Sequence, residues 1–394
     1  MTAKIDFFPV DNGDMVLVTL ESGRTILIDV NIRKSADDEN QEDIVDVATL
    51  LKEKLQRDAE GRLYVDAFLL THPDQDHCRG VERHFHLGKP DDWKNDDNEK
   101  IIIREMWSSP IIFRRKKEVS ETGLCEDANA WWKEARRRVN LYKQTTNKSS
   151  IKDGDRILVL GEDKDGKTND ISDILVKTDD QIRKICGIID NTFTAWLIAP
   201  LLVNEEEAKE LTGKNRSSTI IRFSIKANDN NEAGLFLVGG DAEVQNWERV
   251  WRRNSLKKER LEYNVLLSPH HCSWHSLSHD SWSEKKREAV VDVDARQALA
   301  QAKNQAFIIA SSKTIQDDEN DPPCIRAKEE YEEILNGVNG KFLCVAEECK
   351  EDVLTIEITS TGPQLGTKKS GGFFGAEPGV TPRETEKASG RRYA

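Results

Sequence analysis

The sequence has no uninterrupted apolar run of about 18 residues, the length that a membrane-spanning helix requires. Its first residues contain no basic segment followed by an apolar core, so they are not expected to form a signal peptide. We therefore expect no membrane insertion and a cytoplasmic location.

Cysteine is sparse and shows no pattern. The 7 cysteines are odd in number, and no two of them form a CxxC pair. This argues against a disulfide framework and against a cysteine-based zinc knuckle. Reduced cytosolic thiols are the expectation.

Positive charge is in deficit over the chain as a whole. The formal net charge is −13, with 33% charged and 37% hydrophobic residues. This composition is polar for a globular protein, but it is not that of a chain disordered throughout. The acidic balance argues against nucleic-acid binding by the whole surface, and it leaves a local basic groove open.

One short stretch concentrates chemically active side chains. Residues 64–70 are apolar and rich in β-type residues, which predicts a strand, and the heptapeptide THPDQDH (71–77) follows it directly. Two imidazoles and two carboxylates so close together are costly unless a cation neutralises the carboxylates. Histidine with aspartate suits Zn²⁺ or Mn²⁺. The alternative is a solvated polar loop.

Apolar runs bounded by turn residues predict further strands, and apolar residues at helical spacing predict helices. The predicted strands cover residues 5–10, 15–20, 25–30, 64–70, 101–107, 156–161, 193–200, 218–225, 234–238, 263–268, 306–310, 341–345 and 353–358. The predicted helices cover residues 44–55, 126–145, 243–260 and 325–336. Residues 162–185 carry no pattern that places them.

Other metal-ligand residue types also fall at the ends of predicted strands. Asp29 ends the strand 25–30, Asp241 follows Gly239-Gly240, and His270-His271 follow the strand 263–268. Glycines before Asp241 would let the backbone turn tightly under a ligand. Taken alone, Asp29 is also compatible with a simple loop N-cap. Together, these strand ends predict one site at the edge of a two-sheet scaffold.

In this order, over residues 5 to 325, these motifs resemble the metallo-β-lactamase superfamily. The pieces HxDxDH, Gly-Asp, His-His-x-Ser, Asn-Arg-Ser-Ser (215–218), Ala-Ser-Ser (310–312) and Asn-Asp-Pro-Pro (320–323) are similar to the soluble domain of the bacterial competence DNA-uptake channel (ComEC-like). The resemblance implies an α/β chain of the α+β type, an αββα sandwich of two mixed β-sheets flanked by helices. This domain would span residues 1–360, with insertions near 85–150 and 162–192, and residues 361–394 would form a flexible tail.

The resemblance further implies a site for one or two divalent ions, Zn²⁺ or Mn²⁺. The implied metal ligands are His72 and Asp74 for the first ion, Asp76, His77 and His270 for the second, and Asp241 as the bridge between them. The sequence departs from the superfamily at one point. The superfamily usually has another histidine between the HxxxDH turn and the Gly-Asp motif, and no histidine occurs here between His86 and His270. The first ion could therefore bind weakly, prefer Mn²⁺ or be missing.

The resemblance also implies roles for neighbouring residues. Asp29 would support the turn from behind the ligands. A metal-activated hydroxide near Asp76 would attack the substrate, with His271 on the substrate side or in proton transfer. Either imidazole of the pair 270–271 could be the ligand, and His270 is favoured because it comes first off the strand.

The substrate is predicted from a basic segment. Residues 249–260 carry six cations beside Trp247 and Trp251, which could hold a phosphate backbone and stack bases. The candidate substrate-binding residues are Arg249, Arg252, Arg253 and Lys257. Residues 114–117 and 136–138 could extend such a groove, and a solvated helix face is the alternative.

The predicted function is a metal-dependent hydrolase, a phosphodiesterase or nuclease acting on nucleic acid or a nucleotide. The alternatives are a hydrolase of a small ester, lactone or amide, or a non-catalytic metal-binding module. A protein partner is possible, and the sequence does not identify one.

Overall fold

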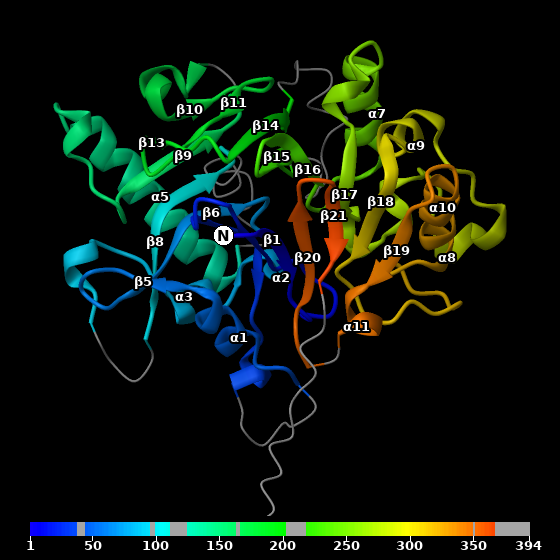
Figure 1. The fold of residues 1–394 in the computed structure, drawn as a ribbon, viewed down its shortest axis with the longest axis horizontal. Helices are drawn as coiled ribbons and strands as arrows, with labels where there is room; N and C mark the ends of the chain where they lie inside the picture. Colours follow the sequence, from blue (N-terminus) through cyan, green and yellow to red (C-terminus); the bar gives the residue numbers. More distant parts are fainter. Residues whose placement is uncertain are drawn as a thin grey trace, which may run out of the picture.

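A computed structural model describes residues 1–37, 44–94, 99–110, 124–162, 166–201, 218–349 and 351–366. Two large mixed β-sheets pack face to face, and helices cover their outer faces (Figure 1). This confirms the predicted αββα arrangement of two mixed sheets flanked by helices.

The first sheet contains most of the N-terminal half. Its strands, in spatial order, are β10 (Leu175–Val176), β9 (Arg156–Leu160), β8 (Ile101–Ser108), β6 (Leu63–Leu70), β3 (Thr25–Ile28), β2 (Val16–Thr19), β1 (Ala3–Phe7), β20 (Leu354–Thr359) and β21 (Gly362–Leu365). Two short strands pair with its members, β5 (Gln56–Arg57) with β6 and β7 (Phe85–His86) with β8. The strands from β3 to β10 are parallel, so their carboxyl ends lie at one edge.

The second sheet contains most of the C-terminal half. Its order is β11 (Gln181–Ile182), β14 (Phe193–Ala199), β15 (Ile220–Ala227), β16 (Asn230–Val238), β17 (Tyr263–Leu267), β18 (Ala302–Ala310) and β19 (Lys341–Cys344). The strands from β16 to β19 are parallel. Separate from both sheets, β12 (Lys184–Ile185) and β13 (Ile188–Ile189) form a hairpin.

The α-helices connect and cover these strands. They are α1 (Val47–Lys54), α2 (Gln75–Cys78), α3 (Val81–His84), α5 (Glu126–Gln144), α7 (Val244–Asn254), α8 (Trp282–Lys285), α9 (Val293–Leu299), α10 (Ile325–Asn336) and α11 (Val345–Glu348). Among the described parts of the chain, no helix combines the length and apolar character needed to cross a bilayer.

Three apolar clusters hold the four layers together. Residues such as Phe7 and Phe236, whose rings meet edge to face at 5.9 Å, fill the space between the sheets. A second cluster joins the first sheet to α1 and α5, where the rings of Phe68 and Trp131 are 4.9 Å apart. The third joins the second sheet to α7, α9 and α10. Burial of these apolar faces is the main favourable term for the fold.

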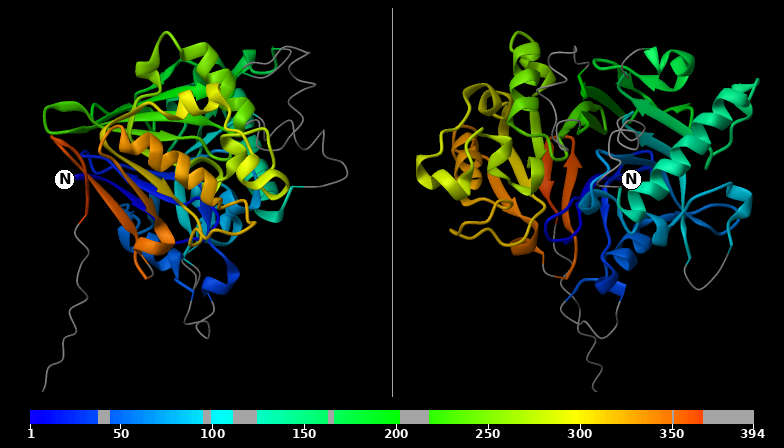
Figure 2. Two further views of the ribbon diagram at one scale, coloured as in Figure 1. Left: turned by 90° about the vertical axis from the view of Figure 1, so that its right-hand side faces the viewer. Right: turned by 180° about the vertical axis from the view of Figure 1, so that it is seen from behind.

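Some predicted boundaries shift. Residues 162–185 contain the short strands β10 and β11 and the start of the β12–β13 hairpin. Helix α7 ends at Asn254, before the predicted limit at 260. Strand β21 carries regular structure past the predicted start of the tail at 361 and pairs with β20, which in turn pairs with the N-terminal strand β1 (Figure 2). Residues 114–117, 215–217 and 367–394 lie outside the described residues.

The topology places four strand ends near one another. β3 and β6 are parallel neighbours in the first sheet, and β16 and β17 are parallel neighbours in the second. The Thr219 amide, at the start of β15, donates to the Thr71 carbonyl at 3.1 Å and ties the two sheets together at this edge. The segments that follow these strands therefore meet.

Candidate metal centre

The turn after β6 delivers the first group of side chains. Helix α2 begins at Gln75, directly after Asp74, and its single turn carries Asp76 and the fully buried His77. The rings of His72 and His77 lie 4.0 Å apart between their centroids. Two imidazoles from one turn thus face the same space.

Asp29, at the end of β3, holds this turn in place. One of its carboxylate oxygens accepts from the Thr71 amide at 2.8 Å, and the other accepts from the Thr71 hydroxyl at 2.6 Å. The second oxygen also lies 2.8 Å from His77 Nδ1. This contact orients the ring, because Nδ1 is committed to Asp29 and Nε2 points inward. Burial raises the pKa of Asp29, and His77 partly offsets that shift.

The loop after β16 brings Asp241 to the centre of the cluster. Gly240 has φ +48°, and a Cβ there would lie 2.8 Å from Thr71 Oγ1, so a side chain would push the two loops apart. Gly240 therefore allows the close approach of this loop to the turn after β6, and the predicted tight turn under a ligand stays a prediction.

The two oxygens of Asp241 face different histidines. Oδ1 lies 2.9 Å from His77 Nε2 and 3.5 Å from His271 Nε2. Oδ2 lies 3.4 Å from His72 Nε2 and 3.7 Å from His270 Nε2. One carboxylate thus joins two pairs of imidazoles.

The loop after β17 separates the adjacent histidines. His270, His271 and Cys272 have φ values of 52°, 53° and 68°, three consecutive non-glycine residues in the left-handed region. Each such residue costs on the order of 1 kcal/mol, and strain of this kind concentrates at functional sites. The His270 amide donates to the Gly240 carbonyl at 3.0 Å, which fixes the loop beside Asp241. The two imidazole planes are inclined at 76°, so each ring faces a different oxygen of Asp241.

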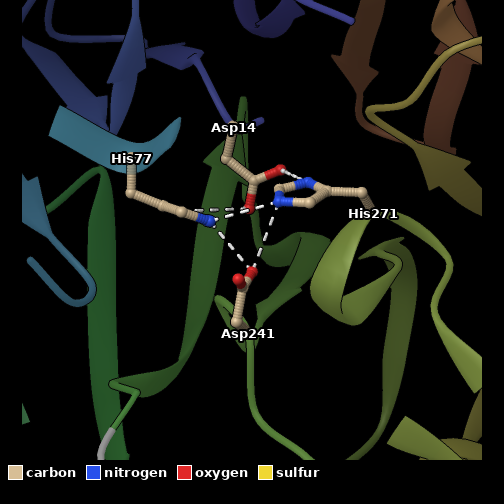
Figure 3. Close-up of side chains that lie close together, drawn as sticks. All are labelled: Asp14, His77, Asp241 and His271. Atoms are coloured by element: carbon tan, nitrogen blue, oxygen red, sulfur yellow. Dashed lines mark hydrogen bonds and ion pairs between the residues drawn. The ribbon is translucent and has the colours of Figure 1, made fainter. Parts of the chain in front are cut away.

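Asp14 is a member of the cluster that the sequence did not reveal (Figure 3). It offers one atom within 4.8 Å of one atom each from His77, Asp241 and His271, and all four residues are buried. Its Oδ1 lies 3.3 Å from His271 Nδ1 and its Oδ2 lies 3.8 Å from His77 Nδ1. Asp14 therefore lies behind His271, as Asp29 lies behind His77, while both Nε2 atoms face Asp241.

Gly13 makes this position of Asp14 possible. Its φ is +151°, and a Cβ there would lie 2.8 Å from the Asp76 carbonyl oxygen. The Asp14 amide donates to that same carbonyl at 3.3 Å. The loop between β1 and β2 is thereby held against the turn after β6.

The cluster carries strongly shifted pKa values. Burial disfavours the charged forms of His77 and His271, but the carboxylates outweigh it. Asp241 and Asp29 hold the pKa of His77 well above its usual value, and Asp241 and Asp14 raise the pKa of His271 to about 10. Burial would likewise raise the pKa of Asp241, yet the surrounding histidines hold it well below its usual value. A cation bound between these groups would replace the protons on the two imidazoles.

Several buried polar atoms of the cluster lack a hydrogen-bond partner among the described residues. They include His72 Nε2, Asp241 Oδ1 and both carboxylate oxygens of Asp14. Unsatisfied buried polar atoms are costly, and a divalent cation would satisfy carboxylate oxygens and imidazole nitrogens together. The donor set suits Zn²⁺ and Mn²⁺ alike. The residues present therefore fit a divalent metal ion.

The remaining predicted ligands lie around this core. Asp74 Oδ2 is 3.9 Å from His72 Nε2, and Asp76 Oδ2 is 3.4 Å from His271 Nε2. The Asp76 side chain is 35% exposed, so it connects the cluster to solvent. Burial opposes the ionisation of Asp76, but the hydrogen bond to His271 and the charge of His77 hold its pKa below the usual range.

The predicted substrate-binding cations lie on α7 or just after it. They are Arg249, Arg252, Arg253 and Lys257. Helix α7 starts just after Asp241, and the ion pair of Arg253 with Asp179 places its C-terminal end beside β14, because the Asp179 amide donates to the Leu197 carbonyl at 2.8 Å.

Ion pairs also occupy part of this basic segment. Arg252 lies 3.2 Å from Asp294 and 3.3 Å from Glu248, and Arg253 lies 2.6 Å from Asp179. These ion pairs are compatible with the alternative of a solvated helix face, and a role of the cations in substrate binding stays a prediction.

Comparison with known proteins adds little. No family model matches the chain, and no curated protein matches it. Among solved structures, the chain is similar to an isothiocyanate hydrolase from Delia radicum gut bacteria, with 10% sequence identity and a TM-score of 0.37. That match covers 90% of this chain and 99% of the other. A likeness at this level carries no argument about activity, and the resemblance to the competence-channel subgroup stays a prediction.

Proposed function

We propose that this chain is a metal-dependent hydrolase whose centre holds two divalent cations bridged by Asp241. The observation that carries the proposal is the division of the Asp241 oxygens between two histidine pairs, His77 with His271 and His72 with His270. A carboxylate placed in this way can bind one cation on each side. The unsatisfied buried atoms of the cluster support the same conclusion.

The proposed ligand sets revise the prediction from sequence. His77, His271 and Asp76 form one position, and His72, His270 and Asp74 form the other. His271 replaces His270 beside His77, because His271 Nε2 faces the same Asp241 oxygen as His77 Nε2. His270 then joins His72 and Asp74 at the first metal position, where the superfamily usually has another histidine.

The residues of the chain divide the chemical work. When bound, the cations supply an activated water and stabilise the negative charge that develops on the substrate. Asp29 keeps the Nε2 atom of His77 directed at Asp241, and Asp14 lies 3.3 Å from Nδ1 of His271 on the side away from Asp241. Asp76 is ionised at neutral pH and reaches solvent, so its carboxylate is placed to hold a cation and to orient the attacking water by accepting a hydrogen bond from it.

A phosphodiester is the first candidate substrate. Bound at the two positions, divalent cations would suit displacement at phosphorus, because they would supply an activated water and stabilise negative charge on the reacting oxygens. A small ester, lactone or amide is the second candidate. It is favoured by the ion pairs of Arg252 with Asp294 and of Arg253 with Asp179, which occupy part of the basic segment predicted to hold a phosphate backbone.

A hydrolysis screen tests the proposal. The purified chain is stripped with a chelator, reloaded with Zn²⁺ or Mn²⁺, and assayed on bis-p-nitrophenyl phosphate, single- and double-stranded DNA, RNA, p-nitrophenyl acetate and a lactone. We expect hydrolysis of a phosphodiester, with loss in His77→Ala and Asp241→Asn. His86→Ala is the matched control, since the His86 side chain contacts the Lys89 carbonyl and lies outside the cluster.

The screen separates the candidates. Hydrolysis of the ester or lactone alone would select the second substrate class. Binding of metal with no turnover of any substrate would reject the hydrolase proposal in favour of a metal-binding module.

A further inference from the structure

A second cavity lies at the β9–β10 edge of the first sheet, with a volume of about 540 Å³. This is within the range of roughly 300–1,000 Å³ that small-molecule sites occupy. Its walls come from the end of α5, from β9 and β10, and from the segment 181–187. Apolar side chains form much of the lining, among them Ile157, Leu158, Ile174, Val176 and Ile182.

This cavity is separate from the metal cluster. None of the proposed metal ligands lines it. Glu105 is the residue of β8 that lines the cavity, and it pairs in register with Ala67 of β6. The turn that carries the metal ligands begins three residues further along β6, after Leu70. Three residues of strand correspond to about 10 Å. A molecule bound in this cavity would therefore not occupy the metal centre.

The carboxylates of this cavity already have partners within the protein. Asp155 lies 2.6 Å from Arg137, and Asp173 accepts from the Tyr142 hydroxyl at 2.8 Å. Glu105 is buried and accepts from Trp107 Nε1 at 2.8 Å, and burial raises its pKa to about 7. At neutral pH Glu105 therefore contributes only part of a negative charge.

The cations that line the same cavity have fewer carboxylate partners. Lys148 donates to the Tyr142 carbonyl, and Arg156 pairs with Asp153. Arg183 donates to the amide oxygen of Gln181, a neutral partner. Within the described residues, neither Arg183 nor Lys184 has an ion pair with a carboxylate. Within the part of the chain that the structure describes, two adjacent cations thus border this cavity without a carboxylate paired to either of them.

We propose that this cavity is a second ligand site, which binds a small organic anion with an apolar body. The apolar body would lie against Leu158, Val176 and Ile182, and its carboxylate, sulfonate or phosphate would pair with Arg183 and Lys184. Charge complementarity and the apolar lining both favour this class of ligand over a neutral or cationic one. The proposal does not depend on hydrolase activity.

Dye binding tests the proposal on the full chain. The anionic probe is 8-anilinonaphthalene-1-sulfonate, and the neutral probe of similar shape is N-phenyl-1-naphthylamine. We expect the sulfonate to bind at one site per chain. Arg183→Gln with Lys184→Gln should weaken sulfonate binding by about tenfold or more and change binding of the neutral dye by less than about twofold.

Two further variants complete the test. Leu158→Trp fills the cavity and should abolish binding of both dyes. Arg252→Gln with Lys257→Gln removes two positive charges from α7 and the segment that follows it, and should change neither affinity. Arg183 and Lys184 are exposed, so their replacement does not endanger folding.

Three results would overturn the inference. They are absence of sulfonate binding to the folded wild-type chain, equal sulfonate affinity in the Arg183/Lys184 double variant, and sulfonate binding that Leu158→Trp leaves unchanged.

Discussion

The carboxyl of Glu105 should make the stability of this protein fall as the pH rises through neutrality. The side chain is 4% exposed on β8, and burial raises its pKa from 4.5 to about 7, while the hydrogen bond from Trp107 partly opposes the shift. A raised carboxyl pKa means that the folded state binds the proton more tightly than the unfolded state. The stabilisation is therefore fully present below about pH 4.5 and is lost as pH rises towards and beyond about 7.

The magnitude follows from the two pKa values. A shift of about 2.5 units corresponds to about 3 kcal/mol over the full range, at about 1.4 kcal/mol per unit. Between about pH 5 and about pH 8.5, the free energy of unfolding should lose about 2 to 3 kcal/mol through this group. Glu105→Gln removes the titration and keeps the size and the acceptor for Trp107.

Urea denaturation of wild type and Glu105→Gln across this pH range measures the effect. The variant should gain about 2 to 3 kcal/mol relative to wild type on going from about pH 5 to about pH 8.5. Any fixed cost of the amide appears equally at both ends and cancels. A difference between the two proteins that stays constant across the range would refute the reasoning.

Three further predictions concern the metal centre and its surroundings. Asp14→Asn should weaken metal binding by about 10- to 100-fold in competition with a chelating indicator, because it removes the carboxylate behind His271; unchanged affinity would contradict that role. Gly240→Ala should lower the free energy of unfolding by about 1–3 kcal/mol in urea titrations, because the new Cβ meets Thr71 at a positive φ. Gly337→Ala is the control, because a Cβ at Gly337 would lie 3.6 Å from its nearest neighbour and the φ of Gly337 is not positive. Equal losses of stability in the two variants would contradict the argument. Arg252→Gln with Arg253→Gln should leave the rate of hydrolysis within about twofold and lower the free energy of unfolding by about 0–1 kcal/mol per ion pair. A large loss of activity would instead indicate that these cations contact the substrate.

The two-sheet scaffold could be predicted because its strands are strongly apolar. Runs such as 64–70 and 263–268 are buried along their length, and their positions in the structure agree with the pattern closely. The strands between residues 175 and 189 escaped prediction because each is only two residues long. Pairs that short have no periodicity, and tertiary contacts decide their conformation.

The site was harder to predict in its details. The turn 72–77 carries its own signal, because ligand residue types follow a buried strand directly. Asp14 carries no such signal, because it ends the turn-rich tetrapeptide 11–14. Only the fold brings His271 beside it. Nor could the order of His270 and His271 along the chain assign their roles, because the assignment depends on a left-handed backbone that turns the two rings apart.

The basic segment shows a different limit of the sequence. Its cations follow Asp241 closely along the chain, which suggested proximity to the site. In the structure, Arg252 pairs with Asp294 and Glu248, and Arg253 pairs with Asp179. A run of cations in the sequence does not show which carboxylates the fold brings beside them.

The number of cations bound per chain tests the central claim most directly. Elemental analysis after reloading and desalting should find two divalent cations in wild type and at most one in the variant His77→Ala with His271→Ala. Asp241→Asn should retain neither cation firmly, because both would share this carboxylate. A single cation in wild type, or full retention of metal by Asp241→Asn, would contradict the account.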